Sequence, residues 1–146
     1  MKTLKYMMTA LLLILVSTAC TGQDKSITVN ELPAPAQEMI KKHFSNEKIT
    51  IVLKDKDRLR VSYDVMFNNG TKVEFNSKGE WAEIDTKPQA VPQALVPSAI
   101  TDYAKKNYPD ARIVQIEHDK RGYEINLSNG LEIRFNNQFK VTEIDD

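Results

Sequence analysis

The chain has 146 residues, with 20 basic and 20 acidic side chains and a single cysteine. This near-neutral charge of mixed sign gives no electrostatic reason to expect nucleic acid or an anionic lipid surface as a partner. Because Cys20 is the only cysteine, no internal disulfide can form, and a thiol nucleophile in the body of the protein is excluded.

The N-terminal segment predicts export. Lys2 and Lys5 precede an uncharged and mostly apolar stretch, residues 7–16, and small residues follow it. This order is typical of a signal peptide, here residues 1–19, and the apolar stretch is too short for a stable membrane-spanning helix. Removal of the peptide leaves 18 basic and 20 acidic residues.

Cys20 stands where lipoprotein processing would place a lipidated cysteine, directly after Thr18 and Ala19. We therefore expect lipidation at Cys20 and a protein that is periplasmic or anchored to the outer membrane, touching the membrane only through that anchor. The alternative is ordinary signal cleavage near Ala19 or Gly22, which would release a soluble periplasmic protein.

An internal repeat organises the rest of the chain. After a polar tether, residues 20–30, the segment 31–85 (repeat 1) matches the segment 96–146 (repeat 2), and residues 86–95 form a linker. Matched positions differ by 64 in the first part of each repeat and by 60 after a four-residue shortening of repeat 2. The matches include Leu32-Pro33 with Val96-Pro97, Lys41-Lys42-His43-Phe44 with Lys105-Lys106-Asn107-Tyr108, Tyr63-Asp64-Val65 with Tyr123-Glu124-Ile125, and Glu83-Ile84-Asp85 with Glu143-Ile144-Asp145.

Each repeat opens with a predicted helix. Apolar side chains recur at helical spacing from Leu32 to Phe44 and from Val96 to Tyr108. Pro33 and Pro97 suit the first helical position, where the missing N–H group has no cost. We interpret the aromatic residues of these helices as core anchors.

Four strands are expected after each helix, and the hydrophobic pattern fixes the register of the central hairpin. A two-residue turn would place Val65 opposite Glu74 and mix core-facing with solvent-facing positions. A three-residue loop instead pairs Val65 with Val73, and the same loop length aligns the apolar residues of repeat 2. Gly70 and Gly130 then take the left-handed position of a bulged turn. The outer strands are expected at about Ile49–Lys54, Glu80–Asp85, Ile113–His118 and Phe139–Ile144.

Neither repeat is large enough to bury much surface alone. We therefore expect an α+β fold in which two tandem α-β-β-β-β repeats form one compact domain. Its sheet is antiparallel, and both helices pack on one face.

The motifs of the repeat resemble those of a known family. They are the opening Leu-Pro or Val-Pro, the Lys-Lys-x-aromatic helix end, the Tyr-x-Val/Ile strand, the Asn-Gly turn and the segment Gly79-Glu80-Trp81. Together they resemble the PepSY-like family of exported bacterial proteins, which shares its architecture with the β-lactamase-inhibitor protein. Repeat 2 departs from the pattern, because Gln138-Phe139-Lys140 lacks the glycine and the tryptophan.

The resemblance implies a helix-backed antiparallel sheet with an open opposite face. Related domains occur in propeptides of secreted peptidases and in inhibitor proteins, so the resemblance also implies binding or inhibition. It supplies no catalytic residue, and shared fold alone is weak support for a function.

A surface is the best candidate for a functional site. If the helices cover one face of the sheet, polar side chains at alternate strand positions lie on the other. The candidate binding surface consists of Asp64, Met66, Glu74, Trp81, Glu124, Asn126 and Arg134. The sequence does not settle whether Trp81 belongs to this surface or to the core, because either Trp81 or Ala82 can face outward.

No catalytic constellation is apparent. His43 and His118 are the only imidazoles and are expected at the surface, without a nucleophile beside them. Asp64 opposite Glu74 either binds a cation or is simply solvated, whereas Glu124 opposite Arg134 is expected to be a salt bridge. We predict no catalytic residue, no metal site and no cofactor.

Two classes of function follow. The first is a non-enzymatic binding module of the cell envelope, an inhibitor of or binder to a peptidase or another envelope or secreted protein. The second is a periplasmic protein that binds a small molecule or a metal in a pocket between the repeats. A broad open sheet face favours the first class, and a deep cavity with converging polar groups favours the second.

Overall fold

The structure is a computed structural model that describes residues 24–146. The predicted signal peptide and Cys20 lie outside the described residues. Two helices, nine strands and two short 3₁₀ turns follow in chain order: β1 Lys25–Ser26, η1 Val29–Glu31, α1 Ala34–His43, β2 Ile49–Asp57, β3 Arg60–Phe67, β4 Lys72–Asn76, β5 Trp81–Asp85, η2 Gln93–Leu95, α2 Ser98–Asn107, β6 Ile113–Asp119, β7 Gly122–Leu127, β8 Glu132–Asn136 and β9 Val141–Asp145. None of these helices is long and apolar enough to cross a membrane.

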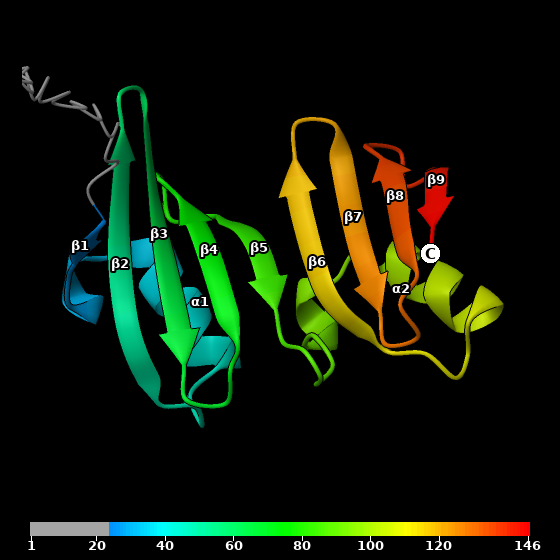
Figure 1. The fold of residues 1–146 in the computed structure, drawn as a ribbon, viewed down its shortest axis with the longest axis horizontal. Helices are drawn as coiled ribbons and strands as arrows, with labels where there is room; N and C mark the ends of the chain where they lie inside the picture. Colours follow the sequence, from blue (N-terminus) through cyan, green and yellow to red (C-terminus); the bar gives the residue numbers. More distant parts are fainter. Residues whose placement is uncertain (1–23) are drawn as a thin grey trace, which may run out of the picture.

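All nine strands form one antiparallel sheet, in which every strand lies beside its neighbours in the sequence (Figure 1). The two repeats are joined within this sheet through β5 and β6, where Glu83 pairs with Glu117, Ile84 with Ile116 and Asp85 with Gln115. The sheet therefore runs without a break from repeat 1 into repeat 2. This confirms the predicted fold class.

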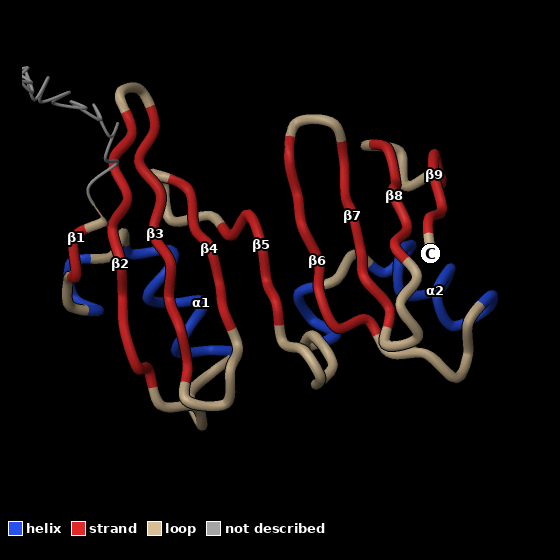
Figure 2. The backbone as a smooth tube through the Cα atoms, in the orientation of Figure 1, coloured by secondary structure: helices blue, strands red, loops and turns tan. Residues whose placement is uncertain are grey.

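Both helices lie on the same side of the sheet, α1 behind the strands of repeat 1 and α2 behind those of repeat 2 (Figure 2). They bury one continuous core with the inward side chains of the strands. Val65, Val73, Ile125 and Ile133 are fully buried there. Because strand side chains alternate, the polar residues between these positions lie on the opposite side. We call that side the open face.

The three-residue hairpin loops are confirmed. Tyr63 pairs with Phe75 and Val65 with Val73, and the equivalent pairs form in repeat 2. Gly70 and Gly130 have φ angles of +88° and +95°. The hydrophobic pattern therefore selected the correct register in both hairpins.

Three local details differ from the sequence-based expectation. Lys25–Ser26, inside the segment predicted as a tether, pair with β2, and Gln93–Leu95 form a 3₁₀ turn inside the linker. Pro33 and Pro97 lie at the N-cap positions, one residue before each helix begins. A short strand such as β1 leaves no periodic pattern in the sequence, because it forms only against an edge that another element supplies.

Candidate functional site

Six of the seven residues of the candidate surface lie on the open face. In repeat 1, Asp64 pairs with Glu74, and Met66 occupies the next outward position of β3. In repeat 2, Glu124 pairs with Arg134, and Asn126 lies two residues further along β7. The continuous sheet brings these two groups onto one surface.

Trp81 is not part of that face. It pairs with Phe75, which is fully buried, and it packs partly buried against the core on the helix side. A register shift between β4 and β5 makes Ala82 an extra residue, so that Glu83 pairs with Glu74. This bulge changes which side chains of β5 point outward, and simple alternation cannot reveal it.

The open face carries a row of five carboxylates. Asp64, Glu74, Glu83, Glu117 and Glu124 are cross-strand neighbours on the five consecutive strands β3 to β7. We call these five residues the acidic row. Like charges directly opposite one another destabilise a sheet, so the row costs stability unless cations or hydrogen-bond donors compensate it.

Compensation is complete only in parts of the row. Lys72 Nζ lies 3.5 Å from Asp64 Oδ1. Gln115 Nε2 donates a hydrogen bond of 2.7 Å to Glu83 Oε1. Arg134 Nε lies 2.8 Å from Glu124 Oε2. The three compensated carboxylates thus alternate with the other two members of the row.

Glu74 and Glu117 are those two members, and within residues 24–146 neither carboxylate forms an ion pair or a side-chain hydrogen bond. Burial is the main cause that raises the pKa of Glu74, and the neighbouring Asp64 carboxylate raises it further. Burial and the Glu124 carboxylate raise the pKa of Glu117. Both groups therefore ionise less readily than a free glutamate, and a cation placed beside them would be stabilised.

The open face of repeat 1 contains a shallow acidic depression of about 420 Å³. Four aspartates and Glu74 line it, together with Ser62 and a single cation, Arg60. Oδ1 of Asp55 and Oδ1 of Asp64 are buried and accept no hydrogen bond within the described chain. The negative charge of this region is therefore balanced only in part, by Arg60 and by the ion pair of Lys72 with Asp64. Ile51 and Met66 lie beside it, with 36% and 42% of their surface exposed.

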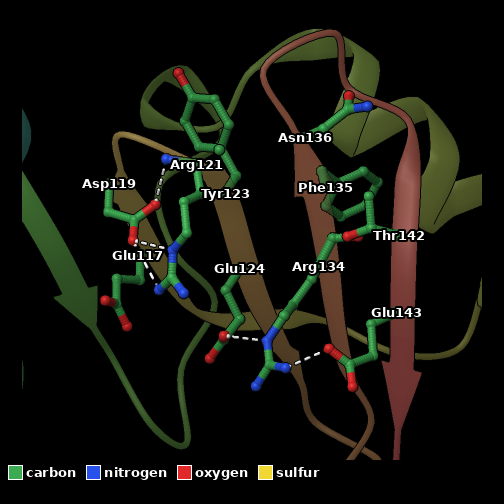
Figure 3. Close-up of a pocket in the computed structure, with 11 residues that line it drawn as sticks. Glu117, Asp119, Arg121, Tyr123, Glu124, Arg134, Phe135, Asn136, Thr142 and Glu143 are labelled. Atoms are coloured by element: carbon green, nitrogen blue, oxygen red, sulfur yellow. Dashed lines mark hydrogen bonds and ion pairs between the residues drawn. The ribbon is translucent and has the colours of Figure 1, made fainter.

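The equivalent region of repeat 2 is a depression of about 440 Å³ with a different charge pattern (Figure 3). Arg134 projects between the carboxylates of Glu124 and Glu143, and its Nη2 lies 2.6 Å from Glu132 Oε1. The hydrogen bonds that Arg134 donates to Glu124 and Glu143 raise the pKa of its guanidinium, so it is charged at every relevant pH. In this half of the open face, Arg134 therefore compensates the three carboxylates around it.

The two histidines lie in different repeats, His43 in α1 and His118 in β6. The His118 ring stacks on Tyr123 at a centroid distance of 4.2 Å and lies 6.1 Å from Trp81. His43 ends α1, away from the open face. Among residues 24–146, no three Asp, Glu, His or Cys side chains are grouped closely enough to hold a metal ion.

The sequence matches the profile of a family described as "Putative beta-lactamase-inhibitor-like, PepSY-like" over residues 18–62 and 61–143. These segments cover most of the chain. The chain belongs to the PepSY-like family. The two matched segments meet in β3 rather than at the linker, and no curated protein matches the sequence.

Solved structures of similar proteins extend this assignment. A protein of Bacteroides vulgatus, described as a "putative periplasmic protein from DUF2874 family", is 50% identical, with a TM-score of 0.83, over 85% of this chain and 98% of its own. A "putative calcium-regulated periplasmic protein" of Bacteroides thetaiotaomicron is 46% identical, with a TM-score of 0.83, over 84% of this chain and 97% of its own.

A further protein of Bacteroides vulgatus, described as a "putative periplasmic protein of unknown function", is 44% identical, with a TM-score of 0.81. The match covers 85% of this chain and all of the Bacteroides vulgatus protein. The periplasmic description of all three relatives supports export of this protein.

Sequence reasoning missed Glu83 and Glu117, the third and fourth members of the acidic row. Each was visible as an acidic residue in an expected strand. Their proximity depends on the β5–β6 pairing, which joins residues 30 to 34 positions apart without a short turn. No local signal in the sequence fixes that register.

Proposed function

We propose that the protein is a non-enzymatic binding module of the cell envelope, whose open face binds a basic segment of an envelope or secreted protein. The observation that carries this proposal is the acidic row, in which two carboxylates lack a compensating cation. Lys or Arg side chains of a partner would neutralise the repulsion between the carboxylates of the row. Loss of this repulsion would add to the favourable free energy of binding.

The spacing of the row favours a helical segment. Neighbouring strands lie about 4.8 Å apart, so five strands place their carboxylates over roughly 19 Å. Basic residues three or four positions apart on a helix lie about 5–6 Å from one another. A basic helix lying across the strands would therefore present successive cations to successive carboxylates, and Ile51 and Met66 would receive apolar residues at its end.

A basic helical peptide tests this proposal. The peptide carries Lys at every third or fourth position, and its control carries Gln at the same positions. We expect the Lys peptide alone to bind, with an affinity that falls as salt rises, because the contacts are ionic. Replacing both Glu74 and Glu117 with Gln should weaken binding about tenfold, or about 1.4 kcal/mol.

Asp102→Asn is the matched control, because it changes an exposed acidic residue on α2, away from the open face. It should leave the affinity unchanged. If Asp102→Asn weakens binding as much as the Glu74 and Glu117 substitutions do, the attraction comes from net charge and not from the acidic row, and the proposal fails.

Lipidation of Cys20 is the second part of the proposal, and it would hold the open face close to envelope proteins. Cells that express the wild type or Cys20→Ser are separated into membrane and soluble periplasmic fractions. We expect the wild type in the membrane fraction and the variant in the soluble fraction. Wild-type protein that is already soluble contradicts the anchor and leaves the binding proposal standing.

Calcium binding is a second candidate function, favoured by the description of the relative from Bacteroides thetaiotaomicron. Carboxylate oxygens are the ligands that Ca²⁺ prefers. Because no three such side chains converge in residues 24–146, a calcium ion would need side chains of the row to rotate or a partner to supply ligands. Calorimetric titration with calcium chloride, with Glu74→Gln as the variant, tests this directly. Saturable heat in the wild type that the variant loses supports it, and no heat excludes it.

A further inference from the structure

A separate cavity lies on the helix side of the sheet, where α2 meets the linker. Its volume is about 190 Å³. Val91 of the linker is fixed beside it, because its N–H donates a hydrogen bond of 2.8 Å to the carbonyl of Ile113. The side chains that bear on its chemistry are Val91, Val96, Thr101, Ala104, Lys105 and Arg112. This cavity shares no residue with the acidic row.

Comparison of the two repeats shows how the space arises. Ala104 occupies the position that Ile40 has in repeat 1, and Thr101 occupies the position of Gln37. Ile40 is buried, and Gln37 Nε2 donates hydrogen bonds to the carbonyls of Leu32 and Asn30. The side chains of repeat 2 are smaller by three carbon atoms and by two heavy atoms respectively. Ile100 is larger than its counterpart Ala36, so the two helices distribute their bulk differently, and the smaller side chains of repeat 2 lie at the end of α2 that lines this cavity.

Thr101 brings an unpartnered hydroxyl to this cavity. The residue is only 7% exposed, and within the described chain its Oγ1 has no hydrogen-bond partner. A buried hydroxyl without a partner lowers the stability of the fold. A ligand with a polar oxygen would remove that cost, so the hydroxyl marks the place where a ligand's polar group belongs.

Two cations complete the lining. Lys105 extends from α2 and Arg112 from the loop before β6, and both are exposed. Neither forms an ion pair within residues 24–146. Apolar walls with two free cations and one hydroxyl donor suit a compact apolar molecule that carries a carboxylate.

We infer that this cavity binds a small organic carboxylate. The apolar body lies against Val91, Val96 and Ala104, and the carboxylate accepts a hydrogen bond from Thr101 and faces Lys105 and Arg112. An apolar cavity of about 150 Å³ is enough to hold benzene, so the volume suits a branched aliphatic or single-ring acid. The inference goes beyond the proposed function and does not depend on it, since the two sites lie on opposite faces of the sheet.

The test uses benzoate and isovalerate as probes, with benzamide and isovaleramide as their neutral counterparts. Each is titrated into the isotopically labelled protein, and backbone amide shifts are followed by NMR. We expect saturable shifts confined to the linker, α2 and residues 111–113, and binding of the acids that is about tenfold tighter than that of the amides. Absence of saturable shifts with all four probes overturns the inference.

Variants taken from repeat 1 make the test specific. Ala104→Ile places the larger side chain of repeat 1 in the cavity and should abolish binding. Thr101→Val keeps the shape without the hydroxyl and should weaken binding several-fold, and Lys105→Gln should reduce the preference for acid over amide. Lys106→Gln, an exposed neighbour outside the cavity, is the control. Undiminished binding in folded Thr101→Val and Lys105→Gln would overturn the inference even if Ala104→Ile failed to fold.

Discussion

The two repeats share one architecture and differ in the charge pattern of their open faces. Asp64 of repeat 1 and Glu124 of repeat 2 occupy equivalent sites, and each has a partner directly across the strand pair. That partner is Glu74 in repeat 1 and Arg134 in repeat 2. In repeat 1 Glu74 therefore has no ion pair within the described residues, whereas in repeat 2 Arg134 pairs with Glu124 and with two further carboxylates.

This difference shows that a duplicated fold can keep its core and specialise its surface. The buried positions of both repeats carry aliphatic and aromatic residues in the same register, because packing tolerates little change in volume. The outward position opposite Asp64 or Glu124 has no such constraint. A change from acid to base there alters what each half of the face can bind without altering the fold.

The largest expected effect comes from Ile84 and Ile144, which lie in the identical sequence Glu-Ile-Asp. Ile84 is fully buried where β5 meets β6, and Ile144 is 45% exposed on β9. Ile84→Ala should lower the free energy of unfolding by about 2–5 kcal/mol, because it leaves a cavity in the core. Ile144→Ala should cost well under half as much. Chemical denaturation measures both, and equal losses would contradict the joined sheet.

The hairpin glycines should behave alike in the two repeats. A Cβ atom at Gly70 or Gly130 would meet no other atom within 4 Å, so the cost of substitution comes from the backbone alone. We expect Gly70→Val and Gly130→Val each to lower stability by about 1–2 kcal/mol, since β-branched residues resist positive φ. Asn should cost less at both sites. Equal tolerance of Val and Asn in denaturant melts would refute the bulged-turn register.

Removing charge from the acidic row should stabilise the protein at neutral pH. Glu74→Gln and Glu117→Gln should each add about 0.2–1 kcal/mol there, the range of cross-strand pairs. Because the pKa of each group is raised on folding, its ionisation costs stability only as the pH rises above the ordinary value of 4.5. The advantage of both variants should therefore disappear below about pH 4. Unfolding measured at pH 3.5 and 7 checks this, and an advantage that persists in acid would contradict it.

The smallest effect is expected at Arg134. Its guanidinium pairs with three carboxylates but is 44% exposed, so Arg134→Gln should change stability less than any substitution above at moderate salt. The loss should shrink as salt rises. Arg121→Gln is the control, because Arg121 is 91% exposed and pairs only with Asp119 at a turn. A salt-independent loss at Arg134 would indicate a packing role instead of an ionic one.

The sequence predicted the hairpins and the open face because these depend on local alternation. Val65 and Val73, separated by one short loop, have a single register that buries both. The same logic placed six of the seven surface residues. The position of Trp81 could not be predicted in this way, because the bulge at Ala82 interrupts the alternation of inward and outward side chains along β5.

The pairing of strands far apart in the chain could not be predicted from the sequence. Glu83 and Glu117 become neighbours only because the edge strands of the two repeats, β5 and β6, pair with each other. The cavity beside Thr101 is similar in kind, since it depends on how the linker returns along α2. Such features follow from tertiary packing and leave no periodic pattern in one segment.

The pairing of β5 with β6 also indicates how a further repeat could be added to the sheet. β9 ends in the same Glu-Ile-Asp sequence as β5, and among residues 24–146 no strand lies on its outer side. The edge that accepted repeat 2 is thus reproduced at the far end of repeat 2. We expect that a third unit fused through the same linker would continue the sheet, so that the protein behaves as one section of a modular ribbon whose length is set by the number of units.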